Sequence, residues 1–151
     1  MKFKYSEKIN ILGISNCPPS ECNPVEDGGV CYRWVHENIE HRNNFIPVLE
    51  INPKRVNSAN FHENPKKCLG FALSMHDSLG NSRNHFYNVL ADLPNFFQIV
   101  GTHVVELSIN VADGYQTKSS PAVFDKGHFD FFEQKDLNWL ERISNKFEIK
   151  K

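Results

Sequence analysis

The sequence predicts an α+β domain with a mixed or mainly antiparallel sheet packed by two or three helices. Segments typical of strands outnumber helical ones, turn residues separate most of them, and only one strand–helix–strand passage is visible. A length of 151 residues fits one domain. We expect it to span residues 1–151, with a frayed basic tail over residues 146–151.

Six segments have the composition or the alternation of β-strands. They are residues 8–15, 30–37, 44–52, 68–76, 102–111 and 127–133. Pro47 confines the third segment to a sheet edge or a bulge. The fourth alternates most clearly, because Leu69, Phe71, Leu73 and Met75 share one face. The opposite face carries small side chains, so we expect a helix or a ligand to approach it closely.

Two segments have helical spacing of their apolar residues. Residues 81–92 place Phe86, Val89 and Leu90 on one face, and Pro94 marks the end of this helix. Residues 136–147 form the second predicted helix, which Asp136 caps. A short helical turn is expected within residues 94–100, and residues 53–67 are expected to form a long loop.

Composition restricts the class of protein. Lys and Arg total 17 against 18 for Asp and Glu, so no net positive field attracts nucleic acid, and we expect no nucleic-acid partner. No run of about 18 apolar residues is present, and the first ten residues carry charges where a signal peptide needs an apolar stretch. We therefore expect a cytoplasmic protein without a membrane partner.

Four cysteines stand at Cys17, Cys22, Cys31 and Cys68. In a cytoplasmic chain we expect free thiols, because cytosolic redox buffering keeps most cysteines reduced. The alternative is a zinc site completed by His36 or His41, since zinc favours these ligand types. No second close pair of Cys or His residues accompanies Cys17 and Cys22, so no metal is expected.

Motifs of common enzyme classes are absent from the sequence. There is no Gly-x-Ser-x-Gly elbow, no Gly-x-x-x-x-Gly-Lys-Ser/Thr loop and no Gly-x-Gly-x-x-Gly fingerprint. His76, followed by Asp77 at the end of a predicted strand, is a candidate general base if the chain turns there, because a carboxylate can orient an imidazole.

Three strand residues suggest a second function class. Arg33 lies on an early predicted strand, Ser74 on a middle one and Glu106 on a later one. This layout, which covers these three residues only, resembles that of ADP-ribosyltransferase-like domains. The resemblance implies that Arg33 contacts the phosphate or ribose of NAD, that Ser74 steadies the NAD site and that Glu106 polarises the ribose hydroxyl. Such roles suit an anion-binding guanidinium and a carboxylate near a developing positive charge.

The sequence thus leaves two functions open. The first is a protein-binding domain without a cofactor, whose interface is Tyr32, Arg33 and Trp34, because these residue types are enriched at interface hot spots. The alternative is an NAD-dependent ADP-ribosyltransferase-like enzyme, with Arg33, Ser74, His76 and Glu106 as candidate ligand-binding residues. Neither the oligomeric state nor the identity of a partner follows from the sequence.

Overall fold

A computed structural model describes residues 2–25 and 28–150 and contains an α+β domain. Its described strands form one seven-stranded sheet in the order β1-β5-β6-β3-β2-β4-β7, and every pairing is antiparallel. The predicted fold class is confirmed. The strands are β1 (Asn23–Pro24), β2 (Gly29–Val35), β3 (Leu73–His76), β4 (His103–Ile109), β5 (Gly114–Gln116), β6 (His128–Glu133) and β7 (Ile143–Glu148).

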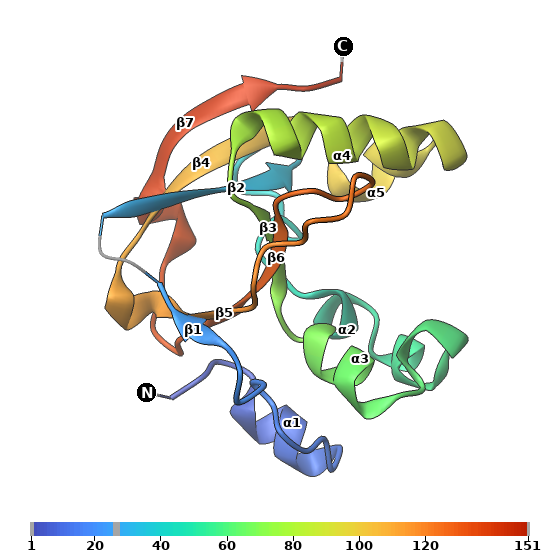
Figure 1. Cartoon of the computed structure of the whole chain (residues 1–151), viewed down its shortest axis with the longest axis vertical. Helices are drawn as coiled ribbons and strands as arrows, with labels where there is room; N and C mark the ends of the chain where they lie inside the picture. The colour runs from blue at the N-terminus through green and yellow to red at the C-terminus, as the bar shows by residue number, and fades with distance from the viewer. Residues whose placement is uncertain (1, 26–27, 151) are drawn as a thin grey trace.

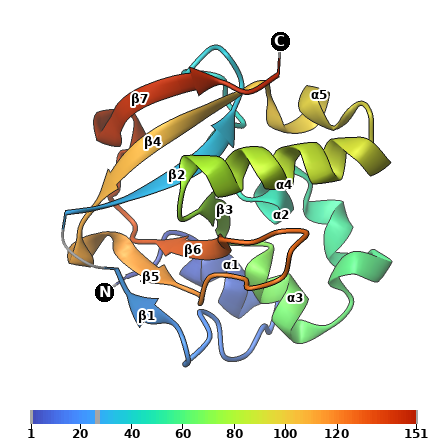
Figure 2. The ribbon, with the colours of Figure 1, turned by 45° about the horizontal axis from the view of Figure 1, so that its top comes forward.

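One long helix and several short ones pack around the sheet (Figure 1). The long helix α4 lies across the sheet near β2 and β3, while α1 and α3 gather near the opposite end of the molecule (Figure 2). The α-helices are α1 (Ser6–Ile11), α2 (Val48–Ile51), α3 (Asn64–Leu69), α4 (Leu79–Asp92) and α5 (Phe96–Val100). The 3-10 helices are η1 (Pro53–Asn57), η2 (Ala59–Phe61), η3 (Val111–Asp113) and η4 (Trp139–Arg142).

The central strands bury side chains on both faces of the sheet. On one face, Cys31 and Val35 of β2 join a core with Met75, Leu107 and Phe131. The other face of β2 carries Tyr32 and Trp34, which pack in a second cluster with residues of α4 and α5. The polar Glu106 and Ser108 of β4 are the less buried positions of this strand, whereas its apolar residues are buried on both faces.

Several predicted elements are confirmed with small shifts of their ends. The strand over residues 30–37 is β2, and the strand over 102–111 is β4; they pair from Gly29↔Ile109 to Val35↔His103. The helix over 81–92 is α4, which the side chain of Ser78 caps by accepting a hydrogen bond from the Asn81 amide. The strand over 127–133 is β6, and the turn in 94–100 is α5.

The predicted strands over residues 8–15 and 44–52 are wrong. The first segment contains α1, which buries Ile9 in a cluster with Leu49 and Phe71. The second contains a turn followed by α2. Short apolar runs suit a strand and a buried helical turn equally, and tertiary packing selected the helix in both cases. The predicted long loop over 53–67 contains η1, η2 and the first part of α3.

The predicted strand over residues 68–76 is correct only from Leu73 onward. Pro65 lies in the first turn of α3, which continues through Cys68. Gly70 then lets the chain approach α2, since a Cβ at this position would lie 2.4 Å from Leu49 Cδ1. This close contact turns the chain from α3 into β3.

The predicted helix over residues 136–147 is also wrong, because η4 and β7 occupy this segment. Ile143 and Phe147 are four residues apart, a spacing that suits one face of a helix. In the strand, a bulge beside Glu106 and Leu107 places them on opposite faces of the sheet, because Ile143 pairs with Leu107 and Phe147 with Val104. The open edge of β4 decided the outcome by pairing with β7, from Leu107↔Ile143 to His103↔Glu148. The segment expected to fray is therefore paired as far as Glu148.

The four cysteines do not all stay free. Cys17 and Cys68 form a disulfide with Cα atoms 5.5 Å apart, whereas Cys22 and Cys31 are free thiols. The expectation of four reduced thiols is corrected, because the fold brings two positions 51 residues apart in the chain within bonding distance. In the described residues, none of the helices has the length and apolar character needed to cross a bilayer.

Candidate functional site

A cavity opens where β2 and β3 separate. These two strands form a register pair only at Tyr32↔His76, and the backbones then diverge. The space beside the divergence is a cavity of about 520 Å³, whose walls come from β2, β3, β6, α3, α5 and residues between 43 and 61. This volume lies in the range of small-molecule sites. The cavity is the candidate functional site.

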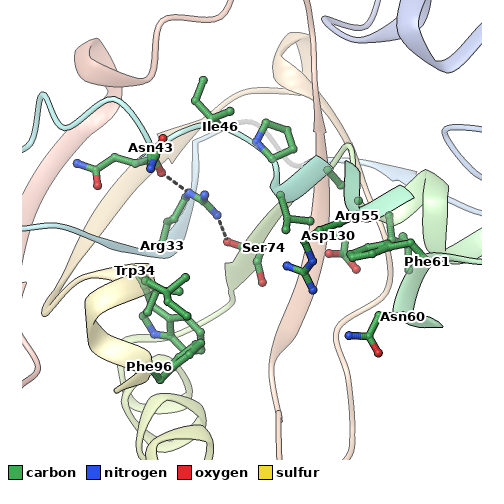
Figure 3. A pocket seen from close by; sticks show the side chains of 18 of the residues that line it. Arg33, Trp34, Asn43, Ile46, Arg55, Asn60, Phe61, Ser74, Phe96 and Asp130 are labelled. Carbon is green, nitrogen blue, oxygen red and sulfur yellow. Dashed lines mark hydrogen bonds between the residues drawn. The ribbon is translucent and has the colours of Figure 1, made fainter. Parts of the chain in front are cut away.

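Arg33 bridges the two separated strands (Figure 3). Its Nε donates to the Asn44 carbonyl at 2.7 Å, and its Nη1 donates to the Ser74 carbonyl at 2.9 Å. Asn44 is buried and is itself held in place, because its amide nitrogen donates to the carbonyls of Asn38 and Ile39. Arg33 is therefore positioned by the loop that follows its own strand and by the strand it faces.

The Arg33 guanidinium brings a positive charge to the cavity wall. Burial lowers its pKa to about 10, so the group stays protonated at neutral pH. Among the described residues, no carboxylate lies within ion-pair distance of it. A buried cation that binds only carbonyl oxygens is suited to an anionic ligand.

Ser74 and Asp130 lie beside Arg33 in the cavity. We define these three residues, Arg33, Ser74 and Asp130, as the floor. Ser74 and Asp130 are register partners on β3 and β6, so their side chains share one face. His128 Nε2 lies 2.5 Å from Ser74 Oγ and 3.9 Å from Asp130 Oδ1. One imidazole thus contacts the hydroxyl group and stands close to the carboxyl group.

The floor contains a carboxyl group that titrates near neutral pH. Burial, with a smaller effect of Asp125, raises the pKa of Asp130 to about 7. Burial and the neighbouring His85 lower the pKa of His128 to about 4, so this ring is neutral at pH 7. A carboxyl group of this pKa can act as a proton donor or acceptor, and perturbed groups of this kind concentrate at functional sites.

Behind the floor lies a pair of further histidines. His76 Nε2 is 2.8 Å from His85 Nδ1, and burial lowers the pKa of His76 to about 3. Asp77 does not orient His76, since its carboxylate accepts a hydrogen bond from Asn81 instead. His76 is fully buried, so the general-base role predicted for a His76–Asp77 pair lacks access to solvent and a carboxylate partner.

Two ends of the cavity differ in character (Figure 3). The aromatic end, which we define as Trp34, Phe96, Ile99 and Val100, comes from β2 and α5. The basic end, which we define as Arg55, Asn60, Phe61 and Lys66, comes from η1, η2 and α3. The Arg55 guanidinium stacks on Phe61, with its Cζ 5.1 Å from the ring centroid.

The predicted interface residues are half-buried in the structure. The Trp34 ring packs edge-on against Phe86 and Phe96, and its Nε1 donates to the Ser82 carbonyl. Tyr32 packs in the same cluster, while Arg33 points to the cavity. The prediction of a protein partner through Tyr32, Arg33 and Trp34 stays a prediction, and the three half-buried side chains point to different surroundings.

The three residues of the predicted NAD layout are not all brought together. Arg33 and Ser74 both line the cavity, and one donates to the other's carbonyl. Glu106 is the register partner of Tyr32 and accepts hydrogen bonds from Tyr32, Ser144 and Asn145, away from the lining residues. The carboxylate nearest to Ser74 in the sheet is instead Asp130.

Sequence reasoning missed Asp130 and Arg55. Asp130 has a sequence signal, because His128 and Asp130 are polar residues at alternate positions of an aromatic strand, and they share one face. Arg55 lies in a segment that was expected to be a loop, and nothing in its local sequence distinguishes it from a surface arginine. No metal site emerges either, since no group of three His, Cys, Asp or Glu side chains in the described residues is arranged to hold an ion.

Comparisons of this chain with protein-family models, with curated proteins and with solved structures give no match.

Proposed function

We propose that the cavity binds NAD and that the protein transfers ADP-ribose from it. The observation that carries the proposal is the convergence of Arg33, Ser74 and Asp130 on one floor, at the point where β2 and β3 separate. This arrangement agrees with the predicted early-strand Arg and middle-strand Ser, and it changes the carboxylate from Glu106 to Asp130.

The charges of the cavity support a dinucleotide. Arg33, Arg55 and Lys66 supply three cationic side chains, whereas Asp130 is the one carboxyl group among the described lining residues. A pyrophosphate carries two negative charges that such groups can bind by charge-assisted hydrogen bonds. The aromatic residues at each end can stack on flat rings. The volume of about 520 Å³ also falls within the range of ligand-sized pockets.

The floor residues have clear roles in such a reaction. The bond between the nicotinamide nitrogen and the ribose carbon breaks, nicotinamide leaves with the bonding electron pair, and the ribose acquires oxocarbenium character. Ionised Asp130 stabilises this positive charge, and Arg33 holds a phosphate. Ser74, held by His128, positions the ribose. A nucleophilic oxygen of water or of an acceptor then bonds to the ribose carbon and releases its proton to solvent water.

Nicotinamide release from NAD tests the proposal, with Glu106→Gln as the matched control for Asp130→Asn. We expect the wild-type protein to release nicotinamide at a rate that rises with pH through about 7, because Asp130 must lose its proton. Asp130→Asn is expected to lower the rate at least about 100-fold and to abolish this pH dependence. Glu106→Gln is expected to retain both the wild-type rate and its pH dependence.

Isothermal titration calorimetry with NAD separates binding from chemistry. Absence of both NAD binding and nicotinamide release in the wild-type protein would overturn the proposal. Loss of release in Glu106→Gln with full activity in Asp130→Asn would show that the carboxylate is Glu106 and that the cavity floor is not the reaction site.

A further inference from the structure

The two ends of the cavity differ in charge as well as in shape. All the Lys and Arg residues among the described lining residues lie on the floor or at the basic end, and the aromatic end contains none. NAD has a matching asymmetry, because its nicotinamide ring is a cation and its pyrophosphate is an anion. A bound NAD molecule therefore has one orientation of favourable charge in this cavity.

We infer that the basic end binds the adenosine phosphate half of NAD through Arg55 and Phe61, and that the nicotinamide ring lies against Trp34 and Phe96. This inference rests on the proposed function and adds the direction in which the substrate lies. Ser74 lies between the two ends in the cavity, as the glycosidic bond lies between the nicotinamide and the rest of the dinucleotide (Figure 3).

The Arg55–Phe61 pair suits this role for a geometric reason. A guanidinium is planar, so a group that stacks on Phe61 with one face can present its other face to a purine ring and its N–H edge to a phosphate. Among the described residues, Arg55 makes no ion pair that would neutralise it. Lys66 adds a second cation at the same end.

The aromatic end suits a cationic ring. Phe96 meets Trp34 edge-on, with their centroids 5.4 Å apart, and both residues line the cavity and are half-buried. His76 and His85 also contact the Trp34 ring, with centroids 4.9 and 5.0 Å away, and Phe96 supplies the second aromatic ring of this end. Aromatic faces attract cations, and this attraction increases where water is excluded. Placing the nicotinamide at the basic end would instead bring its positive charge toward Arg55 and Lys66.

Calorimetric titrations with NAD and with ADP-ribose test the orientation, because ADP-ribose lacks only the nicotinamide. We expect Arg55→Gln to weaken the binding of both ligands about tenfold, the loss typical of one charge-assisted contact. Phe96→Leu, which keeps an apolar side chain, is expected to weaken NAD binding and to leave ADP-ribose binding within about twofold. Arg83→Gln on the exposed side of α4 is the matched arginine control and should change neither.

The failures of the two proposals are distinguishable. If wild-type protein binds NAD but Arg55→Gln weakens only NAD, or leaves both affinities unchanged, the orientation is wrong and the proposed function survives. Equal losses for both ligands in Phe96→Leu, with an unchanged melting temperature, also overturn the orientation. If the wild-type protein binds neither ligand, both proposals fall.

Discussion

The cavity has a sheet wall and a helical wall, and different interactions hold them. The sheet wall carries Arg33, Ser74 and Asp130 on paired strands, and a buried Asn44 fixes the loop behind Arg33. The helical wall, which we define as residues 46–70, carries Arg55 and Phe61 on short helices. Helices of this length are not stable alone, so packing and cross-links must hold them.

Several kinds of contact attach the helical wall to the N-terminal segment. Lys8 of α1 forms an ion pair with Glu50 of α2, and Ile9 and Ile14 pack in one apolar cluster with Leu49. The Cys17–Cys68 disulfide joins α3 to the chain after α1. Nearby, Asn64 exchanges hydrogen bonds with the amide and carbonyl of Ser15. The difference between the walls is that backbone pairing holds the sheet wall, whereas side-chain packing and cross-links hold the helical wall, so we expect the helical wall to open more readily than β2 and β4.

The largest expected effect comes from breaking the disulfide of the helical wall. A bridge between positions 51 residues apart restricts a long loop of the unfolded chain, so its reduction should lower the free energy of unfolding by about 3–4 kcal/mol. Urea denaturation with and without a phosphine reductant measures this loss. Hydrogen exchange should then accelerate over residues 46–70 and change little in β2 and β4.

The control for this prediction is the double variant Cys17→Ser/Cys68→Ser, whose stability should not respond to the reductant. Equal stability of the wild-type protein in both buffers would contradict the prediction. Uniform acceleration of exchange over the whole sheet would show that the two walls unfold together.

A smaller effect is expected from weakening the sheet wall at Asn44. Asn44→Ala removes bonds to the carbonyls of Asn38 and Ile39 and to the His36 amide, and leaves these groups without their partner. We expect the free energy of unfolding to fall by roughly 2–3 kcal/mol. Asn60→Ala, at an exposed position of the basic end, is the matched control and should change stability by less than about 0.5 kcal/mol. Equal losses of unfolding free energy in Asn44→Ala and Asn60→Ala would contradict the prediction that Asn44 holds the sheet wall.

The smallest expected effect concerns the pH dependence of stability at Asp130. Its pKa is raised to about 7 from an ordinary value of 3.8, so the folded protein keeps a proton that the unfolded chain has already released. The contribution of this group to stability therefore falls as the pH rises between about 4 and 7. Asp130→Asn lacks this titration, and its stability relative to the wild-type protein should rise by on the order of 1 kcal/mol from pH 5 to pH 7.

Glu106→Gln is the control, because the fold lowers the pKa of Glu106 and raises that of Asp130. Hydrogen bonds from Tyr32, Ser144 and Asn145 lower the pKa of Glu106, so its contribution to stability is lost only as the pH falls below its ordinary range. The stability difference between this variant and the wild-type protein should therefore stay flat from about pH 5 to pH 7. A flat difference for Asp130→Asn as well would show that burial does not perturb its carboxyl group.

The difference between the sheet wall and the helical wall also explains which elements could be predicted from the sequence. Residues 30–37 combine β-branched and aromatic side chains, residues 102–111 alternate between two sets of side chains, and residues 81–92 repeat apolar side chains at helical spacing. The helical wall has no such pattern. Its short segments adopt their structure because Leu49, Cys68 and Phe71 pack together in one cluster, a condition that a local window of sequence does not contain.

The site follows the same division. The resemblance to ADP-ribosyltransferase-like domains named Arg33, Ser74 and Glu106, and the structure brings Arg33 and Ser74 to one cavity. Glu106 is absent from the lining residues and accepts a hydrogen bond from Tyr32. Its strand position was compatible with the site, but the register of β2 and β4 pairs it with Tyr32 instead of Arg33. A shift of one residue in register changes the face on which a side chain lies.

The sequence by itself determined the α+β class, the central strands and the long helix, because these depend on local periodicity and residue chemistry. Tertiary structure alone decided that Ser6–Ile11 form a helix, that residues 143–148 form a strand, that Cys17 meets Cys68, and that Asp130 lines the same cavity as Arg33. The physical reason is that strand register, open sheet edges and cross-links depend on contacts between residues distant in the chain, where local preferences are too weak to decide.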